Sequence, residues 1–145
     1  MLDSQGFDSK MEEKNNIDLF NEYVAVIFSH LYEKFPVPSR LSAREASGNL
    51  EDSHHKISKN TEICIETIRW LKEAGYIWYE KEHTFGAYDA VLSQKGLELL
   101  KVVPESLKED KSVGDKLLEV MASGGKSAAS DLIKLALTQG YKLFL

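Results

Sequence analysis

Basic side chains that could contact phosphate groups gather around one expected helix. Lysine and arginine supply much of the affinity of nucleic-acid-binding domains through such contacts. The helix is expected from Thr61 to Ala74, and its glutamates outnumber its cations. The candidate residues for nucleic-acid binding are Arg40, Arg44, Lys56, Lys59, Arg69, Lys72 and Lys81. Because the formal net charge of the chain is -5, only a local nucleic-acid surface is expected.

Aromatic and apolar side chains form a second set of candidates, suited to protein contacts. Exposed tyrosine and tryptophan are typical of protein interfaces, and Trp78 and Tyr88 lie on an expected β-hairpin. Short amphipathic helices are expected near the C-terminus, and such helices depend on packing against other elements. We therefore expect a homodimer interface there, with folding back onto the first long helix as the alternative. Its candidate residues are Leu132, Ile133, Leu137 and Phe144.

No residues in the sequence have the spacing of a catalytic or metal site. Cys64 is the only cysteine and falls on the apolar face of its expected helix, which predicts a small buried side chain and not a nucleophile. A single cysteine excludes an intrachain disulfide and a zinc site built from thiolates. His54 and His55 are adjacent, and adjacent side chains point apart in regular structure. We therefore expect no enzyme activity, no cofactor and no metal.

The composition is typical of one soluble domain. A chain of 145 residues can bury one core, and 43% hydrophobic and 28% charged residues are ordinary for a globular protein. No apolar run approaches the roughly 18 residues that span a bilayer, and the first residues lack the pattern of a secretory signal. The single cysteine suits a reducing compartment. These features predict a cytoplasmic protein without a membrane partner.

The apolar periodicity predicts a mainly helical chain with a small β-hairpin. A polar flexible tail is expected over 1–16, and 49–60 is expected to be mostly loop. Apolar spacings of three and four predict the first long helix, and alternating aromatic and β-branched residues predict the hairpin, with a loop over 81–87. The expected elements are helices over 17–35, 43–47, 61–74, 94–103, 113–122 and 127–139, and strands over 76–80 and 88–92.

Polar residues and glycines predict where these helices begin and end. Ser42 opens a capping box for the short helix, and Thr61 is the expected N-cap of the helix that follows the loop. Ser93 is the expected cap of the helix after the hairpin. Gly75 is expected in a left-handed conformation just after a helix end, and Gly140 is expected to end the last helix.

Two segments resemble the winged helix-turn-helix superfamily. Leu71-Lys-Glu-Ala-Gly-Tyr-Ile77 is similar to the helix exit of that superfamily, and Leu92-Ser-Gln-Lys-Gly-Leu-Glu-Leu-Leu100 is similar to the segment after its hairpin, or wing. The resemblance implies a three-helix core with a hairpin, often dimeric and often DNA-binding. The predicted fold is mainly α with a small β-hairpin: a winged-helix core over 17–104 and a C-terminal helical pair over 112–145, for packing or dimerisation.

Two functions of different classes are expected from these features. The first is a transcriptional regulator that binds double-stranded DNA through the basic set. The alternative is a winged-helix module that binds protein and not DNA, which the acidic helix and the aromatic hairpin favour. DNA binding through several phosphates weakens steeply as salt rises, whereas an aromatic interface changes little, so the salt response distinguishes the two.

Overall fold

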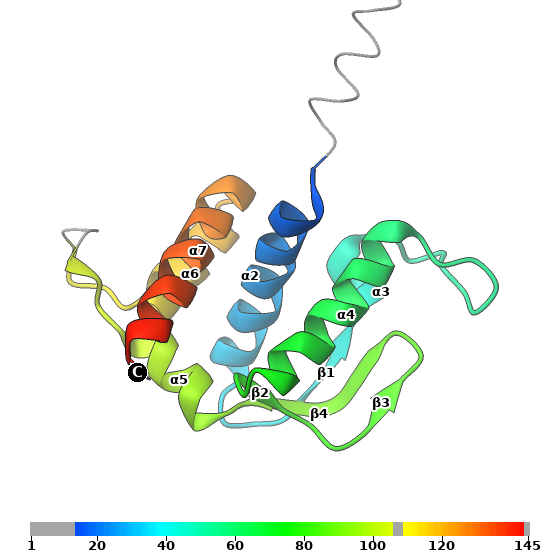
Figure 1. The fold of residues 1–145 in the computed structure, drawn as a ribbon, viewed down its shortest axis with the longest axis horizontal. Coiled ribbons are helices and arrows are strands. Elements are labelled where there is room, and N and C mark those ends of the chain that lie inside the picture. Colours follow the sequence, from blue (N-terminus) through cyan, green and yellow to red (C-terminus); the bar gives the residue numbers. More distant parts are fainter. Residues whose placement is uncertain (1–13, 106–108, 144–145) are drawn as a thin grey trace, which may run out of the picture.

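Helices surround one central helix, and a small antiparallel sheet covers one edge of the bundle (Figure 1). The computed structural model describes residues 14–105 and 109–143. Within these residues the chain is mainly helical, as the sequence predicted. None of the described helices combines the length and the apolar composition that crossing a bilayer requires.

The central helix is α2 (Asn16–Lys34). The side chain of Asn15 caps it by accepting a hydrogen bond from the backbone N–H of Asp18 at 2.8 Å. The helix ends shortly before Pro36, because proline disfavours helical geometry in the residue that precedes it. The expected helix over 17–35 is confirmed to within one residue at each end.

The sheet contains β1 (Ser39–Ser42), β2 (Ile77–Trp78), β3 (Glu82–His83) and β4 (Gly86–Leu92). β4 lies between β1 and β2 and also pairs with β3. The sequence did not predict β1, which has a single large apolar residue, Leu41, opposite Ala87 of β4. The expected loop over 81–87 was wrong in extent, because β3 pairs directly with the start of β4 and leaves a short turn.

Two helices follow β1 on the same side of α2. α3 (Ala43–Ser47) is capped by the Ser42 hydroxyl as predicted. α4 (Lys59–Glu73) begins two residues before Thr61, so the predicted N-cap is wrong. Ser58 precedes the helix, while Thr61 is fully buried with its hydroxyl 2.9 Å from that of Ser47. The left-handed Gly75 after this helix is confirmed, with φ of 86°.

Three helices complete the chain: α5 (Gln94–Lys101), α6 (Val113–Ala122) and α7 (Lys126–Leu143). Ser93 caps α5 as expected, accepting from the backbone N–H of Gly96 at 3.0 Å. α6 and α7 fold back onto α2, which is the arrangement given as the alternative to a dimer interface. α7 continues through Gly140, so the expected end of this helix there was wrong.

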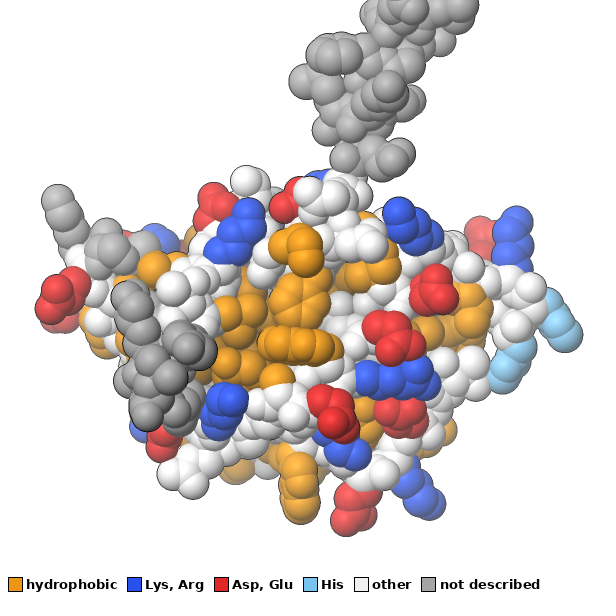
Figure 2. All heavy atoms as spheres, viewed as in Figure 1, with side chains coloured by type: hydrophobic (Ala, Val, Ile, Leu, Met, Phe, Trp, Pro, Cys, Tyr) orange, Lys and Arg blue, Asp and Glu red, His pale blue; other side chains and the backbone are white. Residues whose placement is uncertain are grey.

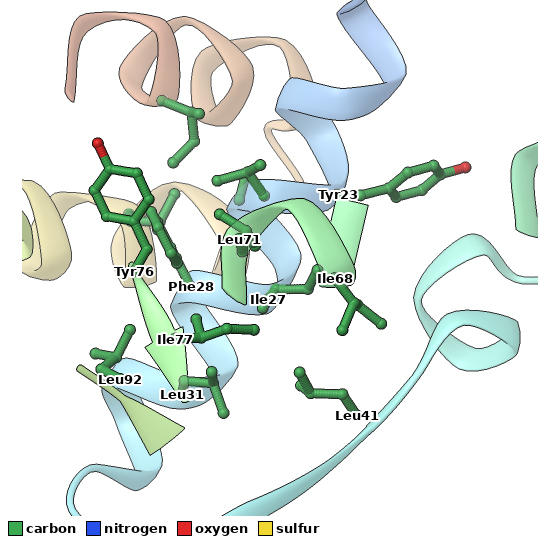
Figure 3. Close-up of a cluster of buried hydrophobic side chains, with 14 of the residues drawn as sticks. Tyr23, Ile27, Phe28, Leu31, Leu41, Ile68, Leu71, Tyr76, Ile77 and Leu92 are labelled. Carbon is green, nitrogen blue, oxygen red and sulfur yellow. The ribbon is translucent and has the colours of Figure 1, made fainter. Parts of the chain in front are cut away.

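One buried cluster joins the two expected parts of the chain. α3 and α4 pack on one side of α2, and α6 and α7 pack on another, as Figure 1 shows. Figure 3 shows side chains of α2 meeting those of α4, β1, β2 and β4 around Phe28 and Leu71. The same cluster includes Leu117 of α6 and Ile133 of α7. The described residues of the segments 17–104 and 112–145 therefore share one core.

Candidate interaction surface

Arg44 is engaged with its own chain. Its Nη1 donates a hydrogen bond to the backbone carbonyl of Asp52 at 3.0 Å, and its guanidinium carbon lies 4.8 Å from the centre of the Phe85 ring. These contacts hold the segment after α3 and the hairpin turn together. The side chain is half-buried in this position, so it is poorly placed to contact a nucleic-acid phosphate.

Arg69 connects α4 to the hairpin. Its Nη1 lies 2.7 Å from the Glu66 carboxylate, and its Nε lies 3.2 Å from the Glu82 carboxylate. The Tyr79 hydroxyl donates to Glu82 at 2.8 Å. Hydrogen bonds from Tyr79 and then Arg69 lower the pKa of Glu82, and the bond to Glu82 raises the pKa of Arg69. Because one guanidinium faces two carboxylates, this part of α4 offers no net positive charge.

The other predicted cations are spread over the surface. Arg40 lies 3.7 Å from the Glu45 carboxylate, and Lys72 Nζ lies 4.6 Å from the centre of the Tyr79 ring. The remaining members of the set, which make no ion pair with any described residue, are Lys56, Lys59 and Lys81. The structure therefore brings Arg69 and Lys72 together beside the hairpin, while Arg44 is turned inward.

An apolar groove runs between α2 and α4. It encloses about 590 Å³. Ile17 and Trp70 line it and are 66% and 46% exposed. The Phe20 and Trp70 rings meet edge to face with centroids 5.0 Å apart, and Trp70 stacks on Tyr76 at 6.3 Å. The packed rings give the groove a rigid apolar floor.

Acidic side chains form one rim of this groove. Glu62 and Glu66 line it from α4, one helical turn apart. Glu66 also holds Arg69, so Glu62 is the carboxylate of the rim that has no ion-pair partner among the described residues. Figure 2 shows hydrophobic side chains gathered over the middle of this face, with charged side chains of both signs beside them. Such an apolar surface with charged edges is typical of a protein-binding site.

The sequence did not predict this groove. A signal was nevertheless present on α4, because Ile63 and Trp70 lie two helical turns apart, beside the turn from Glu62 to Glu66. A helix with an apolar edge beside an acidic edge indicates a surface that packs against apolar side chains and attracts positive charge.

The hairpin residues expected at an interface are exposed. Trp78 is 62% exposed and Tyr88 is 45% exposed. The Tyr88 ring lies 4.8 Å from the His83 ring. Neither Trp78 nor Tyr88 lines the groove between α2 and α4, so they form a second apolar surface on the hairpin.

The expected interface residues of α7 are mostly covered by the chain itself. Leu132 and Ile133 are buried, and Leu137 is half-buried. In this fold Leu132 and Ile133 pack inside one chain, so they are not accessible to a second copy. Phe144 lies outside the described residues. Self-association therefore stays a prediction that would need other residues.

Cys64 lies in the core and not at a surface. It is fully buried, and burial raises the pKa of its thiol to about 12. The thiol therefore keeps its proton at neutral pH, whereas a nucleophilic cysteine is an accessible thiolate. Within the described residues, no group of three or more histidine, cysteine, aspartate or glutamate side chains could hold a metal ion.

Neither a family model, nor a curated protein, nor a solved structure matches this chain. Its function is therefore inferred from its own surface. The groove between α2 and α4 has the apolar lining, the accessible volume and the charged rim of a binding site. Two arginines of the predicted basic set, Arg44 and Arg69, make their contacts within the chain. The groove is accordingly the candidate functional site.

Proposed function

We propose that this chain is a winged-helix interaction module that binds a protein partner in the groove between α2 and α4. The partner is an amphipathic helical segment with apolar anchors and adjacent lysine or arginine residues. The observation that carries this proposal is the exposed apolar lining, with Ile17 and Trp70, next to the acidic rim at Glu62 and Glu66.

The order of the elements supports the winged-helix part of the proposal. α2, α3 and α4 contact one another and are followed by the hairpin of β2 and β4. The superfamily resemblance implies a three-helix core followed by a hairpin, and this order supports that part of the proposal. A shared fold does not determine a function, so the choice of partner rests on the surface.

The groove suits a helix better than an extended chain. Partner helices bind apolar grooves through anchors spaced three, four and seven residues apart, and the lining here comes from two helices. Tryptophan and tyrosine side chains that pack firmly are frequent centres of binding energy. Trp70 is held between Phe20 and Tyr76 while almost half of it stays exposed, so it is available as such a centre.

The charge of the rim favours a basic partner over a second copy of the chain and over the first 13 residues of the chain itself. In a symmetric dimer the same surface meets itself, which would bring Glu62 of each copy near the other. The first 13 residues of this chain carry four acidic side chains against one lysine, so they too repel the rim. A segment rich in lysine or arginine complements it.

DNA binding is the second candidate function. It is supported by the same order of elements and by the exposed cations Lys56, Lys59 and Lys81, which make no ion pair within the described residues. The matched charges around Arg69 and the inward contacts of Arg44 favour the protein partner. Mixed-sequence duplex DNA titrated at roughly 50 and 200 mM salt tests this candidate directly, because phosphate contacts weaken over that range.

The test of the docking proposal uses two labelled helical peptides with the same apolar face. One has lysine beside the apolar anchors and the other has glutamate, and fluorescence anisotropy measures both. We expect the lysine peptide to bind more tightly than the glutamate peptide. Trp70→Ala should weaken binding of the lysine peptide by more than about tenfold, as the loss of a central aromatic side chain does. Trp78→Ala is the matched control, since Trp78 is also exposed but lies outside the groove.

A charge reversal on α4 completes the test. Glu62→Lys should weaken the lysine peptide by roughly three- to tenfold, given the strength of exposed ion pairs. Glu73→Lys makes the same change on an exposed residue of α4 outside the groove and should have little effect. Equal binding of both peptides, or equal loss in the Trp70 and Trp78 variants, would contradict the proposal.

A further inference from the structure

A second pocket lies on the hairpin, where the two strands separate between their paired ends. It encloses about 540 Å³, which is within the roughly 300 to 1,000 Å³ common for ligand sites. It shares no lining residue with the groove between α2 and α4. Figure 1 shows that the hairpin lies on the side of the molecule away from α6 and α7. The residues that line this hairpin pocket are Trp78, Tyr79, Glu80, Lys81, Tyr88 and Asp89.

Two large aromatic side chains of the hairpin pocket are open to water. Trp78 and Tyr88 are both exposed, and Tyr79 is buried below them. The face of an aromatic ring attracts a cation, and the Tyr79 ring already has such a contact with Lys72. The exposed rings of Trp78 and Tyr88 therefore offer a surface that suits a group with both a positive charge and an apolar or planar body.

Two carboxylates lie opposite each other in the same pocket. Trp78 pairs with Val91 at one end, and Glu82 pairs with Ala87 at the other, so three residues of each strand lie between these pairs. Glu80 and Asp89 are the middle residues of these two stretches. Both are exposed, and neither makes an ion pair with a described residue. Like charges on directly opposite residues destabilise a strand pair.

The backbone of Asp89 adds a second local cost. Asp89 has φ of 48°, and it is the one non-glycine residue with a positive φ in the described part of the chain. Tyr88 and Asp89 are both exposed between the buried Ala87 and Ala90, whereas a regular strand would alternate. The left-handed conformation thus brings a ring and a carboxylate of neighbouring residues to the same pocket. A cation bound between the carboxylates would offset their repulsion.

We propose that the hairpin pocket binds an arginine side chain of a partner protein. The guanidinium lies between the carboxylates of Glu80 and Asp89, with its plane against an exposed ring of Trp78 or Tyr88. A guanidinium pairs with carboxylates, stacks on aromatic rings and is more weakly hydrated than an ammonium group, so it suits this combination better than lysine does. Lys81 is the cation of the pocket, and two carboxylates leave one negative charge in excess.

The arginine has to come from another protein. The chain has three arginines, and each makes contacts within it: Arg40 with Glu45, Arg44 with the Asp52 carbonyl, and Arg69 with Glu66 and Glu82. In a symmetric dimer through this pocket the carboxylates of the two copies would face each other. The proposal goes beyond the groove and does not rest on it, since the two sites have separate linings.

A nuclear magnetic resonance titration of the ¹⁵N-labelled full chain tests this proposal. The probes are N-acetylarginine amide, N-acetyllysine amide and N-acetylcitrulline amide, the last being an uncharged analogue of arginine. We expect the arginine probe to shift the hairpin amides and the Trp78 indole N–H saturably, with a Kd on the order of 10 mM. The lysine probe should bind several-fold more weakly, and the citrulline probe should not saturate the same shifts.

Substitutions at the carboxylates separate binding from a structural role. Glu80→Gln with Asp89→Asn should weaken the arginine probe by about fivefold or more, given the strength of exposed ion pairs. Asp89→Asn alone should weaken it by about two- to fivefold without lowering the melting temperature, because asparagine also tolerates the left-handed conformation and the repulsion is removed. A residue that served only the hairpin itself would instead lose stability on this change.

Matched controls test the place of binding. Glu51→Gln with Asp131→Asn makes the same change of charge at exposed residues outside the pocket, and should leave the Kd within about twofold. Trp70→Ala, which removes the centre of the groove, should also leave it unchanged. The proposal is overturned if citrulline binds as well as arginine, or if the control pair weakens binding as much as the pocket pair. Absence of a saturable shift at about 50 mM, or hairpin shifts that depend on protein concentration without a probe, would overturn it as well.

Discussion

Replacing Ile133 by alanine tests whether the C-terminal helices belong to the core of a single chain. Ile133 lies on α7, is fully buried and belongs to the same cluster as Phe28 of α2. The change removes three side-chain carbons, and at about 0.8 kcal/mol for each buried group the loss of burial alone costs about 2.4 kcal/mol. Incomplete collapse of the cavity raises the expected cost to roughly 3 to 4 kcal/mol.

Urea unfolding followed by circular dichroism measures this cost. With a slope of about 1 to 3 kcal/mol/M, the midpoint should fall by roughly 1 to 4 M. Asp131→Ala, at an exposed residue of the same helix, is the control and should change stability by less than about 0.5 kcal/mol. The midpoint should also not depend on protein concentration, since the burial arises within one chain. A cost for Ile133→Ala below about 1 kcal/mol would refute the packing of α7 described above.

Two further predictions concern acid stability and a close backbone contact. The pKa of Glu82 is lowered in the folded protein. The contribution of Glu82 to stability is therefore complete above the unfolded pKa of about 4.3, and it is lost as pH falls through the lower folded pKa. Glu82→Gln should therefore narrow the difference between urea midpoints at pH 7 and at about pH 3, and an unchanged difference would contradict this. Gly96→Ala would place a Cβ 2.1 Å from the Tyr76 carbonyl oxygen, so it should lower the melting temperature far more than Gly124→Ala. Gly124 has φ of 77° but no neighbour within 4 Å, so its cost should be about 1 to 2 kcal/mol, and similar losses at both positions would argue against this close approach.

The helices were predictable where the local sequence alone determines them. The apolar stripe of α2 and the capping box at Ser42 need no distant partner to be recognised. Gly75 could be placed for the same reason, because a left-handed residue at a helix end has a local cause. Each of these features was correct to within a residue or so.

Features that depend on distant residues could not be predicted in this way. β1 has no strand pattern of its own and is a strand because β4 supplies its hydrogen-bonding partners. α4 starts earlier than predicted because its N-cap residue is Ser58 and not Thr61. Thr61 instead contacts Ser47 and Asn49. The amphipathic pattern of α7 is the same whether its apolar face meets α2 or a second chain.

The candidate surface also depends on contacts between residues that are distant in the sequence. The sequence gives the number of cations but not their partners, so Arg44 and Arg69 were counted as available although both have contacts within the chain. The groove needs α2 and α4 side by side, and the hairpin pocket needs the register that places Glu80 opposite Asp89. Neither can be derived from the spacing of residues within one segment.

The position of α2 between the earlier and the later helices has a consequence for biosynthesis. α2 is made early, α3 and α4 can cover one side of it soon afterwards, and the side that meets α7 waits until that helix has been translated. At the usual rates of elongation this interval is on the order of 10 s. During that time apolar side chains of α2 stay open to water or to a chaperone, so the nascent chain is most prone to aggregate just before α7 leaves the ribosome.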